Sequence, residues 1–316
     1  MGGGLLKQTA GIQYASSSIL ESVDFISHGF LSRIGGVSKP PFSSLNFDMR
    51  DGDDIANVEH NKAQVGRLFG FGANRLLTIN QVHGSDVLVI DKAVKNISGI
   101  SKISADAIIT NQCGIAIGIL TADCVPILLL EPVKKVIGVV HAGWRGTVKA
   151  IVQKTIDTMV KQFGSDKKTI LAAIGPSIGQ CCYKVDEVVA KKFGGNEFII
   201  PLYPPLKKGD TKGDLSKGSR GDSCWRLDLK KANLSQMASS GILEKNISVE
   251  NLCTSCRNDL FFSYRADNKK TGRQLNFIVL NGRSLDIQFF PFDSNDHICY
   301  LCGRIGGYYG KGCFAK

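Results

Sequence analysis

The sequence lacks the long apolar segments that direct a protein into or across a membrane. Its longest apolar stretch, residues 114–122, is followed by Asp123, whereas a membrane-spanning helix needs about 20 apolar residues. The chain starts with MGGGLLK, which contains no apolar core of signal-peptide length. We therefore expect a cytoplasmic protein with no membrane partner.

Histidine is scarce and cysteine is sparse. The chain has five histidines and no His-x-His pair, whereas a true multicopper oxidase needs roughly ten histidine ligands. Ten cysteines in 316 residues are too few for a disulfide-framework domain. Since we also expect no secretion signal, most thiols are predicted to be reduced.

Common phosphate-binding and nucleophile motifs are also missing. We find no Walker A sequence, no G-x-G-x-x-G between a strand and a helix, and no G-x-S-x-G elbow. Lys and Arg number 39 against 28 Asp and Glu, a formal net charge of +11. The lysines are scattered in pairs and form no basic stripe, so we expect no nucleic-acid partner. An anionic substrate such as phosphate is compatible with this charge.

Short apolar runs dominate the centre of the chain. Several lack polar alternation, which is typical of strands buried on both faces. The expected strands occupy residues 76–82, 86–90, 115–121, 126–130, 136–140 and 169–174. Apolar residues at helical spacing predict one helix that begins after Thr147 as N-cap and ends at Gly164. This mixture predicts an α/β or α+β fold around a large buried sheet.

One stretch of low complexity interrupts the second half. Residues 201–221 read PLYPPLKKGDTKGDLSKGSRG and are rich in turn-forming residues that cannot build a core. We predict a surface loop there. Because 316 residues suit one large or two ordinary domains, the loop is either an excursion from one domain or a linker between two.

Three reactive side chains are expected at strand ends, namely His83, Cys124 and His141. If residues 133 and 134 form a two-residue turn, His141 pairs with Pro126, two positions from Cys124. Diagonal neighbours in a sheet lie about 7–8 Å apart, within side-chain reach. A thiolate and two imidazoles with an open fourth position describe a catalytic zinc site. The alternatives are a Cys124–His141 nucleophile–base dyad and three unrelated side chains packed at the core edge.

Other cysteines form pairs. Two Cys-x-x-Cys pairs begin at Cys253 and Cys299, and their separation exceeds the roughly 15–20 residues usual in zinc sites. They either share a structural zinc or are incidental thiols. The adjacent Cys181 and Cys182 are expected to pack in a loop without a disulfide to each other.

A series of ordered blocks gives the chain a family resemblance from about residue 28 to about residue 278. The blocks are 32–38 (SRIGGVS), 44–46 (SLN), 81–84 (QVHG), 105–107 (ADA), 121–124 (TADC), 141–146 (HAGWRG), 174–179 (IGPSIG), 182–183 (CY), 228–229 (DL), 253–254 (CT), 262–265 (FSYR) and 271–273 (TGR). They resemble the laccase-domain or polyphenol-oxidase family, multicopper-oxidase-like proteins regarded as purine nucleoside phosphorylases. The number and order of the blocks make this resemblance specific.

The resemblance implies a fold and a domain plan. The expected fold is a single layered α-β sandwich with mixed sheets, similar to the cytotoxic-necrotising-factor-like deamidases. The expected plan is an N-terminal extension over residues 1–27, a domain over 28–285 that carries surface loop 201–221, and a Cys-containing tail over 286–316.

The resemblance also implies an activity and a metal. The family's zinc ligands fall on His83, Cys124 and His141, one zinc per chain. The implied activity is phosphorolysis of adenosine, inosine, guanosine and methylthioadenosine to a base and ribose-1-phosphate, with adenosine deamination as a second activity. Purine nucleosides and phosphate are the expected partners.

Five further side chains are candidates for contacts with substrate. Arg145 is the first candidate for phosphate, because a guanidinium suits bidentate phosphate contact. Arg33, Arg265 and Gln81 are candidate substrate-binding residues. Asp123, beside Cys124, is expected either to orient a ligand or to act as a general acid or base.

Rival functions remain open at this point. One is a metal-free thiol hydrolase or deamidase that uses Cys124 and His141. Another is copper-dependent polyphenol oxidation, in which copper would be an adventitious replacement at the zinc position. A non-enzymatic interaction module with a structural zinc is a third. The chain also departs from the family pattern SYRRD, because residues 263–267 read SYRAD.

Overall fold

Two six-stranded sheets form the centre of the structure, a computed structural model that describes residues 6–92, 99–194, 197–202 and 225–281. In the first sheet the strand order is β1 (Lys7–Thr9), β2 (Ile12–Ala15), β3 (Ile26–Leu31), β15 (Gln274–Leu280), β7 (Ala116–Thr121) and β4 (Leu76–Leu77). Its middle strands are antiparallel, and β4 pairs with β7 in parallel. Strands from both ends of the described chain therefore meet in one sheet.

The second sheet carries most of the predicted strands. Its order is β14 (Ile247–Val249), β10 (Leu171–Ile174), β8 (Val125–Glu131), β9 (Val136–Ala142), β6 (Ala107–Thr110) and β5 (Val87–Ile90). Parallel pairs at both edges make it a mixed sheet. A small third sheet consists of β11 (Lys184–Val185), β13 (Trp225–Leu227) and β12 (Ile199–Pro201).

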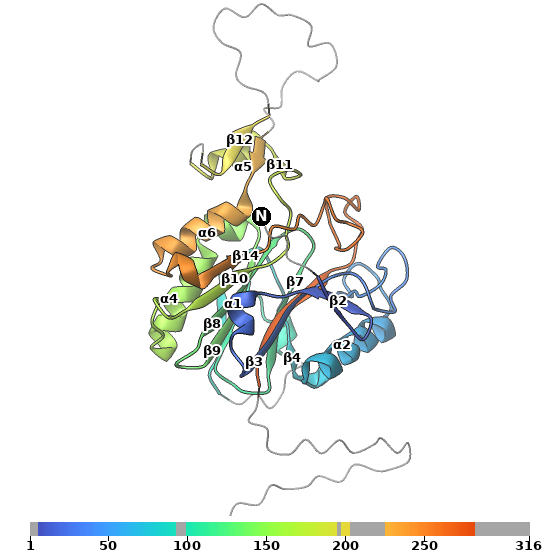
Figure 1. Cartoon of the computed structure of the whole chain (residues 1–316). Coiled ribbons are helices and arrows are strands. Elements are labelled where there is room, and N and C mark those ends of the chain that lie inside the picture. The colour runs from blue at the N-terminus through green and yellow to red at the C-terminus, as the bar shows by residue number, and fades with distance from the viewer. Residues whose placement is uncertain (1–5, 93–98, 195–196, 203–224, 282–316) are drawn as a thin grey trace, which may run out of the picture. The chain divides into compact units, whose positions relative to one another are not determined.

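Helices cover the outer faces of the two large sheets (Figure 1). The α-helices are α1 (Ser18–Glu21), α2 (Ile55–Phe69), α3 (Trp144–Val148), α4 (Ile151–Phe163), α5 (Glu187–Lys191) and α6 (Leu229–Ser239). Short 3-10 turns span Ala73–Arg75, Ile100–Lys102 and Glu244–Asn246. Helices α4 and α6 pack on the second sheet, and α2 packs near the first. The architecture is thus a layered α-β sandwich with mixed sheets, as predicted.

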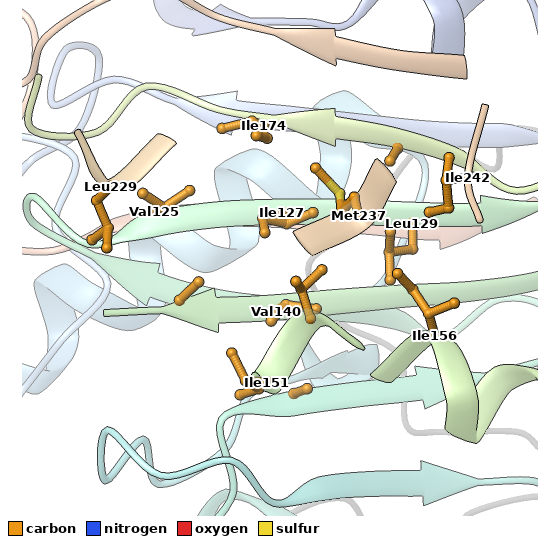
Figure 2. Close-up of a cluster of buried hydrophobic side chains, with 14 of the residues drawn as sticks. Val125, Ile127, Leu129, Val140, Ile151, Ile156, Ile174, Leu229, Met237 and Ile242 are labelled. Atoms are coloured by element: carbon orange, nitrogen blue, oxygen red, sulfur yellow. The ribbon is translucent and has the colours of Figure 1, made fainter. Parts of the chain in front are cut away.

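Strand β8 explains why the apolar runs show no alternation. Its residues Ile127 and Leu129 face the helices α4 and α6, whereas Leu128 and Leu130 face the first sheet, and all four are fully buried. Figure 2 shows the first group, in which Ile127 and Leu129 lie near Met237 of α6. A strand between two apolar layers must be apolar on both faces, so an uninterrupted apolar run is the expected sequence.

The register of the central hairpin agrees with the predicted turn. Strand β8 pairs with β9 in antiparallel order, and Pro126 lies opposite His141. Cys124 directly precedes β8, and the loop residue Asp123 before it takes a positive φ of 97°. The hairpin therefore brings the ends of the two strands, with Cys124 and His141, to the same edge.

The predicted helix after Thr147 is wrong at its start. The structure has two helices, α3 and α4, separated by Ala150, whose φ of 59° is left-handed. Thr147 lies inside α3, where its hydroxyl donates to the carbonyl of Gly143 at 3.1 Å. The apolar spacing continues across Ala150, because a single residue with left-handed backbone leaves the pattern of side chains unchanged. The break therefore could not be predicted from the sequence. The predicted end at Gly164 is confirmed, with a φ of 66°.

The predicted strand over residues 76–82 is largely wrong too. Only Leu76–Leu77 forms a strand, because the following segment takes other partners. The Gln81 side chain bonds to both the N–H and the carbonyl of Leu120 at 2.8 Å, in place of a backbone ladder. The N–H groups of the next three residues donate to the carboxylate of Asp106. Side chains thus satisfy hydrogen bonds that a longer strand would have made.

The domain plan stays a prediction. Strand β2 pairs with β3, so residues on both sides of position 28 share one sheet. The predicted tail 286–316 and residues 203–221 of the predicted surface loop lie outside the described residues. Within the part of the chain that the structure describes, no helix has the length and apolar character needed to cross a membrane.

Candidate metal and substrate site

His83, Cys124 and His141 lie together at one edge of the second sheet. Cys124 precedes β8, His141 lies in β9, and His83 lies in the loop before β5. The His83 Nε2 and Cys124 Sγ atoms are 3.8 Å apart, and the two imidazole rings have centroids 4.8 Å apart. One ligand atom from each residue lies within 4.8 Å of the other two. His141 is buried and His83 is exposed, so the cluster opens to solvent on the His83 side.

Asp106 organises this cluster although its side chain is completely buried. One carboxylate oxygen contacts His141 Nδ1 at 2.7 Å and accepts from the N–H of His83 at 3.0 Å. The other oxygen accepts from the N–H of Val82 at 3.2 Å and from Gly84 at 2.6 Å. One carboxylate therefore orients one imidazole and holds the loop that carries the other. The Nε2 atom of His141 is left as the ring nitrogen that can take a metal.

The thiol and imidazole of the cluster polarise each other. Burial raises the pKa of the Cys124 thiol, but the charges and hydrogen bonds of His141 and His83 outweigh burial and lower it to about 6. Burial also lowers the pKa of His141, yet Cys124 and Asp106 outweigh burial and raise it to about 9. Both pKa shifts favour a thiolate next to an imidazolium when no metal is bound. A thiolate is the form of cysteine that binds metal.

Gly143 lies directly against the cluster. A Cβ added at this residue would stand 3.0 Å from Cδ2 of His83 and 3.1 Å from Sγ of Cys124. Both distances are tighter than ordinary van der Waals contact between such atoms. The glycine of the bend after His141 therefore gives the ligands room to approach each other.

Asp123 ties the Cys124 loop to a segment far along the chain. One oxygen of its carboxylate accepts from the hydroxyls of Thr254 at 2.6 Å and Ser263 at 2.7 Å, and the other accepts from the N–H of Arg265 at 2.7 Å. Burial raises the pKa of this carboxyl above its usual value, and the three hydrogen bonds reduce that rise. Since both oxygens are engaged, this geometry suits a residue that positions Cys124.

Two arginines and a tyrosine lie around the rim. The exposed Arg145 guanidinium stacks on Trp144, with its carbon 4.4 Å from the ring centroid. Among the described residues no carboxylate lies within ion-pair distance of Arg145. Arg265 donates to the carbonyl of Lys184 at 3.1 Å and lies 5.6 Å from the ring of Tyr183. Burial raises the pKa of Tyr183, and charges of the surrounding site, including Cys124 and Arg145, act on the same phenol.

Two other candidates make contacts within the fold. Arg33 donates to the carbonyls of Ser43 at 2.8 Å and Asn258 at 2.9 Å, and its guanidinium also lies 3.6 Å from an oxygen of Asp267. Gln81 is buried, and both ends of its amide bond to Leu120. These contacts favour structural roles for both side chains.

Comparison with known proteins identifies the family. The profile of the family described as "Multi-copper polyphenol oxidoreductase laccase" matches residues 27–281. The chain belongs to this family. Because the match includes all three cluster residues and most of both large sheets, it covers the candidate site as a whole.

Relatives of similar length carry an enzymatic name. Purine nucleoside phosphorylase YlmD of Geobacillus stearothermophilus is 34% identical over 254 residues, which cover 79% of this chain and 88% of the relative. Purine nucleoside phosphorylase YlmD of Bacillus subtilis is 33% identical over 255 residues, 79% of this chain and 87% of the relative. Family members of this kind are enzymes, and so is this chain.

A solved structure agrees with the fold. The crystal structure of the hypothetical protein YfiH of Bacillus licheniformis superposes with a TM-score of 0.75 at 28% identity. The superposition covers 87% of this chain and 99% of that chain. The layered sandwich is therefore shared with a family member over nearly its whole length.

The distribution of histidines bears on the copper in the family's description. His28 is buried, and its Nε2 accepts from the N–H of Ser17 at 3.0 Å. His60 lies on α2. Within the part of the chain that the structure describes, His83 and His141 are the histidines that share a possible metal-binding group. A trinuclear copper cluster needs more imidazoles than this.

Two residues of the site had no assigned role in the sequence. Asp106 and Tyr183 both fall in blocks that carry the family resemblance, but nothing in their spacing showed what they contact. One sign for Asp106 was present in the sequence, because an aspartate stands directly before the apolar strand β6. A carboxylate buried at such a position needs several hydrogen-bond donors around it. Tyr183 follows Cys182 in a loop whose position depends on the tertiary fold.

Proposed function

We propose that this protein is a zinc-dependent purine nucleoside phosphorylase that also deaminates adenosine. The proposal rests on the cluster of His83, Cys124 and His141, which is open to solvent on one side. Close to it in the chain is the exposed guanidinium of Arg145, which has no carboxylate partner among the described residues. The names of the relatives support the reaction class.

The donor set fits zinc. Tetrahedral bonds of about 2.05 Å to nitrogen and about 2.3 Å to sulfur place the two donors about 3.6 Å apart. His83 Nε2 and Cys124 Sγ lie 3.8 Å apart, so a small movement brings them to that spacing. Three protein ligands leave one position open, as in catalytic sites. A bound zinc would supply Lewis acidity towards an oxygen of substrate or water.

The protein groups around the ligands set their geometry. Asp106 holds a proton on His141 Nδ1 and so keeps Nε2 free for the metal. Asp123 holds the loop that presents Cys124 through its bonds to Thr254, Ser263 and Arg265. We therefore assign Asp123 a positioning role rather than proton transfer.

The rim residues would bind the substrates. In phosphorolysis an oxygen of phosphate forms a bond to the ribose C1′ carbon while the bond from C1′ to the purine nitrogen breaks. Inosine and phosphate thus give hypoxanthine and ribose-1-phosphate. Arg145 can clamp the phosphate, because its fork is exposed and unpaired with a carboxylate in the described structure. Tyr183, with the guanidinium carbon of Arg265 5.6 Å from its ring centroid, is the aromatic side chain at the rim that could contact the purine.

Deamination would bind the purine at the same rim, with water in place of phosphate. Water adds at the amino-bearing carbon of adenosine and ammonia leaves, which gives inosine. This reaction needs no bound phosphate. The two activities should therefore depend differently on Arg145.

The basic test follows products by chromatography. Purified protein with inosine and phosphate should release hypoxanthine and ribose-1-phosphate in equal amounts. A chelated, metal-free sample should lose this activity and regain it with zinc. Full phosphorolysis in the metal-free protein would contradict zinc dependence. Absence of ribose-1-phosphate formation together with copper-dependent oxidation of a phenol would favour the oxidase alternative.

A second test separates the two activities through Arg145. Arg145→Ala should slow inosine phosphorolysis at least about 10-fold, about 1.4 kcal/mol of transition-state stabilisation, and slow adenosine deamination much less. Arg145→Lys should recover only part of the loss, because lysine keeps the charge but not the fork. The exposed Arg75→Ala serves as a matched control. Equal losses in both reactions at equal zinc content would contradict a phosphate clamp.

A further inference from the structure

Four cysteines from two distant segments meet outside the cluster described above. Cys181 and Cys182 lie in the loop between β10 and β11, and Cys253 and Cys256 lie in the segment between β14 and β15. All four Sγ atoms lie within 4.8 Å of one another. The pair that begins at Cys299, which the sequence analysis weighed as a possible partner for the pair at Cys253, lies outside the described residues.

The sulfur spacing fits a metal better than a disulfide. The Sγ atom of Cys256 lies 3.5 Å from that of Cys181 and 3.3 Å from that of Cys182. A disulfide bond is about 2.05 Å long. Four zinc–sulfur bonds of about 2.3 Å in a tetrahedron place the sulfurs about 3.8 Å apart. Two contacts a few tenths of an ångström below this value, with the remaining pairs within 4.8 Å, surround a space of the size of one metal ion.

The backbone at Gly179 is shaped around these sulfurs. Its N–H donates to Sγ of Cys253 at 3.1 Å, a bond that stabilises a thiolate ligand. A Cβ at this position would stand 3.1 Å from Sγ of Cys181 and 3.2 Å from Cβ of Cys253. A bridge between Ser177 and Cys253 holds the two segments in register. The fold therefore builds the proximity of the two cysteine pairs into the backbone.

Two cationic side chains, Lys230 and Arg226, lie next to the segments that carry the four cysteines. Lys230 is 9% exposed, and its Nζ donates to the carbonyls of Glu250 at 2.6 Å and Leu252 at 2.9 Å, next to Cys253. Among the described residues no carboxylate lies within ion-pair distance of Lys230. The charges of Cys253, Asp228 and Glu250 act on this ammonium, so negative charge at the cysteine cluster helps to stabilise it. Arg226 also donates to the carbonyl of Cys181. A zinc ion with four thiolates carries a net charge of −2, which these cations would balance.

We propose that Cys181, Cys182, Cys253 and Cys256 bind a second zinc ion, separate from the site at His83, Cys124 and His141. Each cysteine binds as a thiolate and releases its proton to solvent. Four protein ligands leave no open position, so the ion is structural.

The four-cysteine site would stabilise the position of the site at His83, Cys124 and His141. Cys182 precedes Tyr183 at the rim, and Cys253 precedes Thr254, which donates to Asp123 at 2.6 Å. A metal bound by both cysteine pairs thus fixes the segments of Tyr183 and Thr254, which lie next to the loop of Cys124. Loss of this metal should lower stability first and activity only through the positions of these groups.

Metal counting tests the proposal. The protein as purified in the presence of zinc should contain about two zinc ions per chain by elemental analysis. Cys256→Ser and Cys124→Ala should each contain about one, and the double variant close to none. The exposed Cys113→Ser removes a thiol outside both groups and should keep two. Unchanged zinc in Cys256→Ser would overturn the proposal.

The same measurements distinguish this proposal from the catalytic one. A wild type with one zinc that is lost in Cys256→Ser but kept in Cys124→Ala supports the second site and contradicts the first. One zinc with the reverse behaviour contradicts the second site. A disulfide at Cys256, detected as a thiol count lower by two on denatured, unreduced wild type and located by peptide mapping, would also overturn the proposal.

A measurement on Cys124→Ala covers the case in which Cys256→Ser does not fold. X-ray absorption at the zinc edge of this variant should show sulfur neighbours alone, at about 2.3 Å. Nitrogen or oxygen neighbours in place of sulfur would exclude the four-cysteine site.

Discussion

Replacing Asp106 with asparagine gives the sharpest test of how the candidate zinc site is organised. The substitution keeps the size of the side chain but exchanges one accepting oxygen for an NH2 group. In the structure one oxygen serves His141 and the N–H of His83, and the other serves the N–H groups of Val82 and Gly84. The remaining oxygen of an asparagine can accept from the groups on one side. On the other side its NH2 group faces N–H groups that need an acceptor.

Either orientation of the asparagine is costly, for different reasons. If its NH2 group faces Val82 and Gly84, two partly buried N–H groups lose their acceptor, at up to about 1–3 kcal/mol each. If the NH2 group faces His141, the imidazole can accept at Nδ1 only by moving its proton to Nε2, the atom that would bind zinc. We therefore expect zinc affinity to fall about 10–100-fold, the usual cost of losing such an outer partner. The free energy of unfolding of the metal-free protein should fall by about 2–4 kcal/mol.

The assay is a zinc competition titration against a chromophoric chelator, combined with urea unfolding in excess chelator so that metal binding does not enter the stability. Asp157→Asn is the matched control, because this carboxylate is exposed on α4 and pairs with Lys167. Zinc affinity of Asp106→Asn within about twofold of wild type would refute the reasoning about His141. Lower stability with unchanged zinc affinity would restrict Asp106 to holding the His83 loop.

Two further predictions concern residues near and far from the site. Gly143→Ala would place a Cβ 3.0–3.1 Å from the side chains of two ligands, so zinc affinity and phosphorolysis should both fall at least about 10-fold. Gly99→Ala is the control and should change neither, because its Cβ has open space around it. Burial lowers the pKa of His28 to about 4 from 6.5, with Glu21 and Lys7 as its charged neighbours. The unfolded chain therefore binds a proton that the folded chain does not, and this residue should cost about 1.4 kcal/mol of stability per pH unit as the pH falls from about 6.5 towards 4, by linkage. His28→Gln should remove that part of the pH dependence of urea unfolding, and identical slopes in the two proteins would contradict the assignment.

The sequence determined the features that depend on neighbouring residues. Apolar runs of strand length predicted β8 and β9, because a strand between two apolar layers is apolar on both faces. The short turn between them fixed their register, so the proximity of Cys124 and His141 followed from counting alone. The ordered blocks then placed the chain in its family and supported the inclusion of His83, which strand-end position alone had suggested.

The tertiary structure decided everything that depends on distant segments. His83 reaches the cluster because β5 pairs in parallel with β6, and the carboxylate of Asp106 at the start of β6 gathers its loop. The break at Ala150 arises where the chain turns from the site into α4.

The four cysteines of the proposed second zinc site illustrate the same limit. Cys181 and Cys253 meet because β10 pairs in parallel with β14, and the bridge at Ser177 continues that pairing. No spacing in the sequence encodes this contact, and the sequence left open whether the pair at Cys253 shares a zinc with the pair at Cys299 or consists of incidental thiols. Local patterns report burial and turns, because these depend on residues a few positions apart. The order of strands in a sheet depends on how whole layers pack, and only the folded chain reveals it.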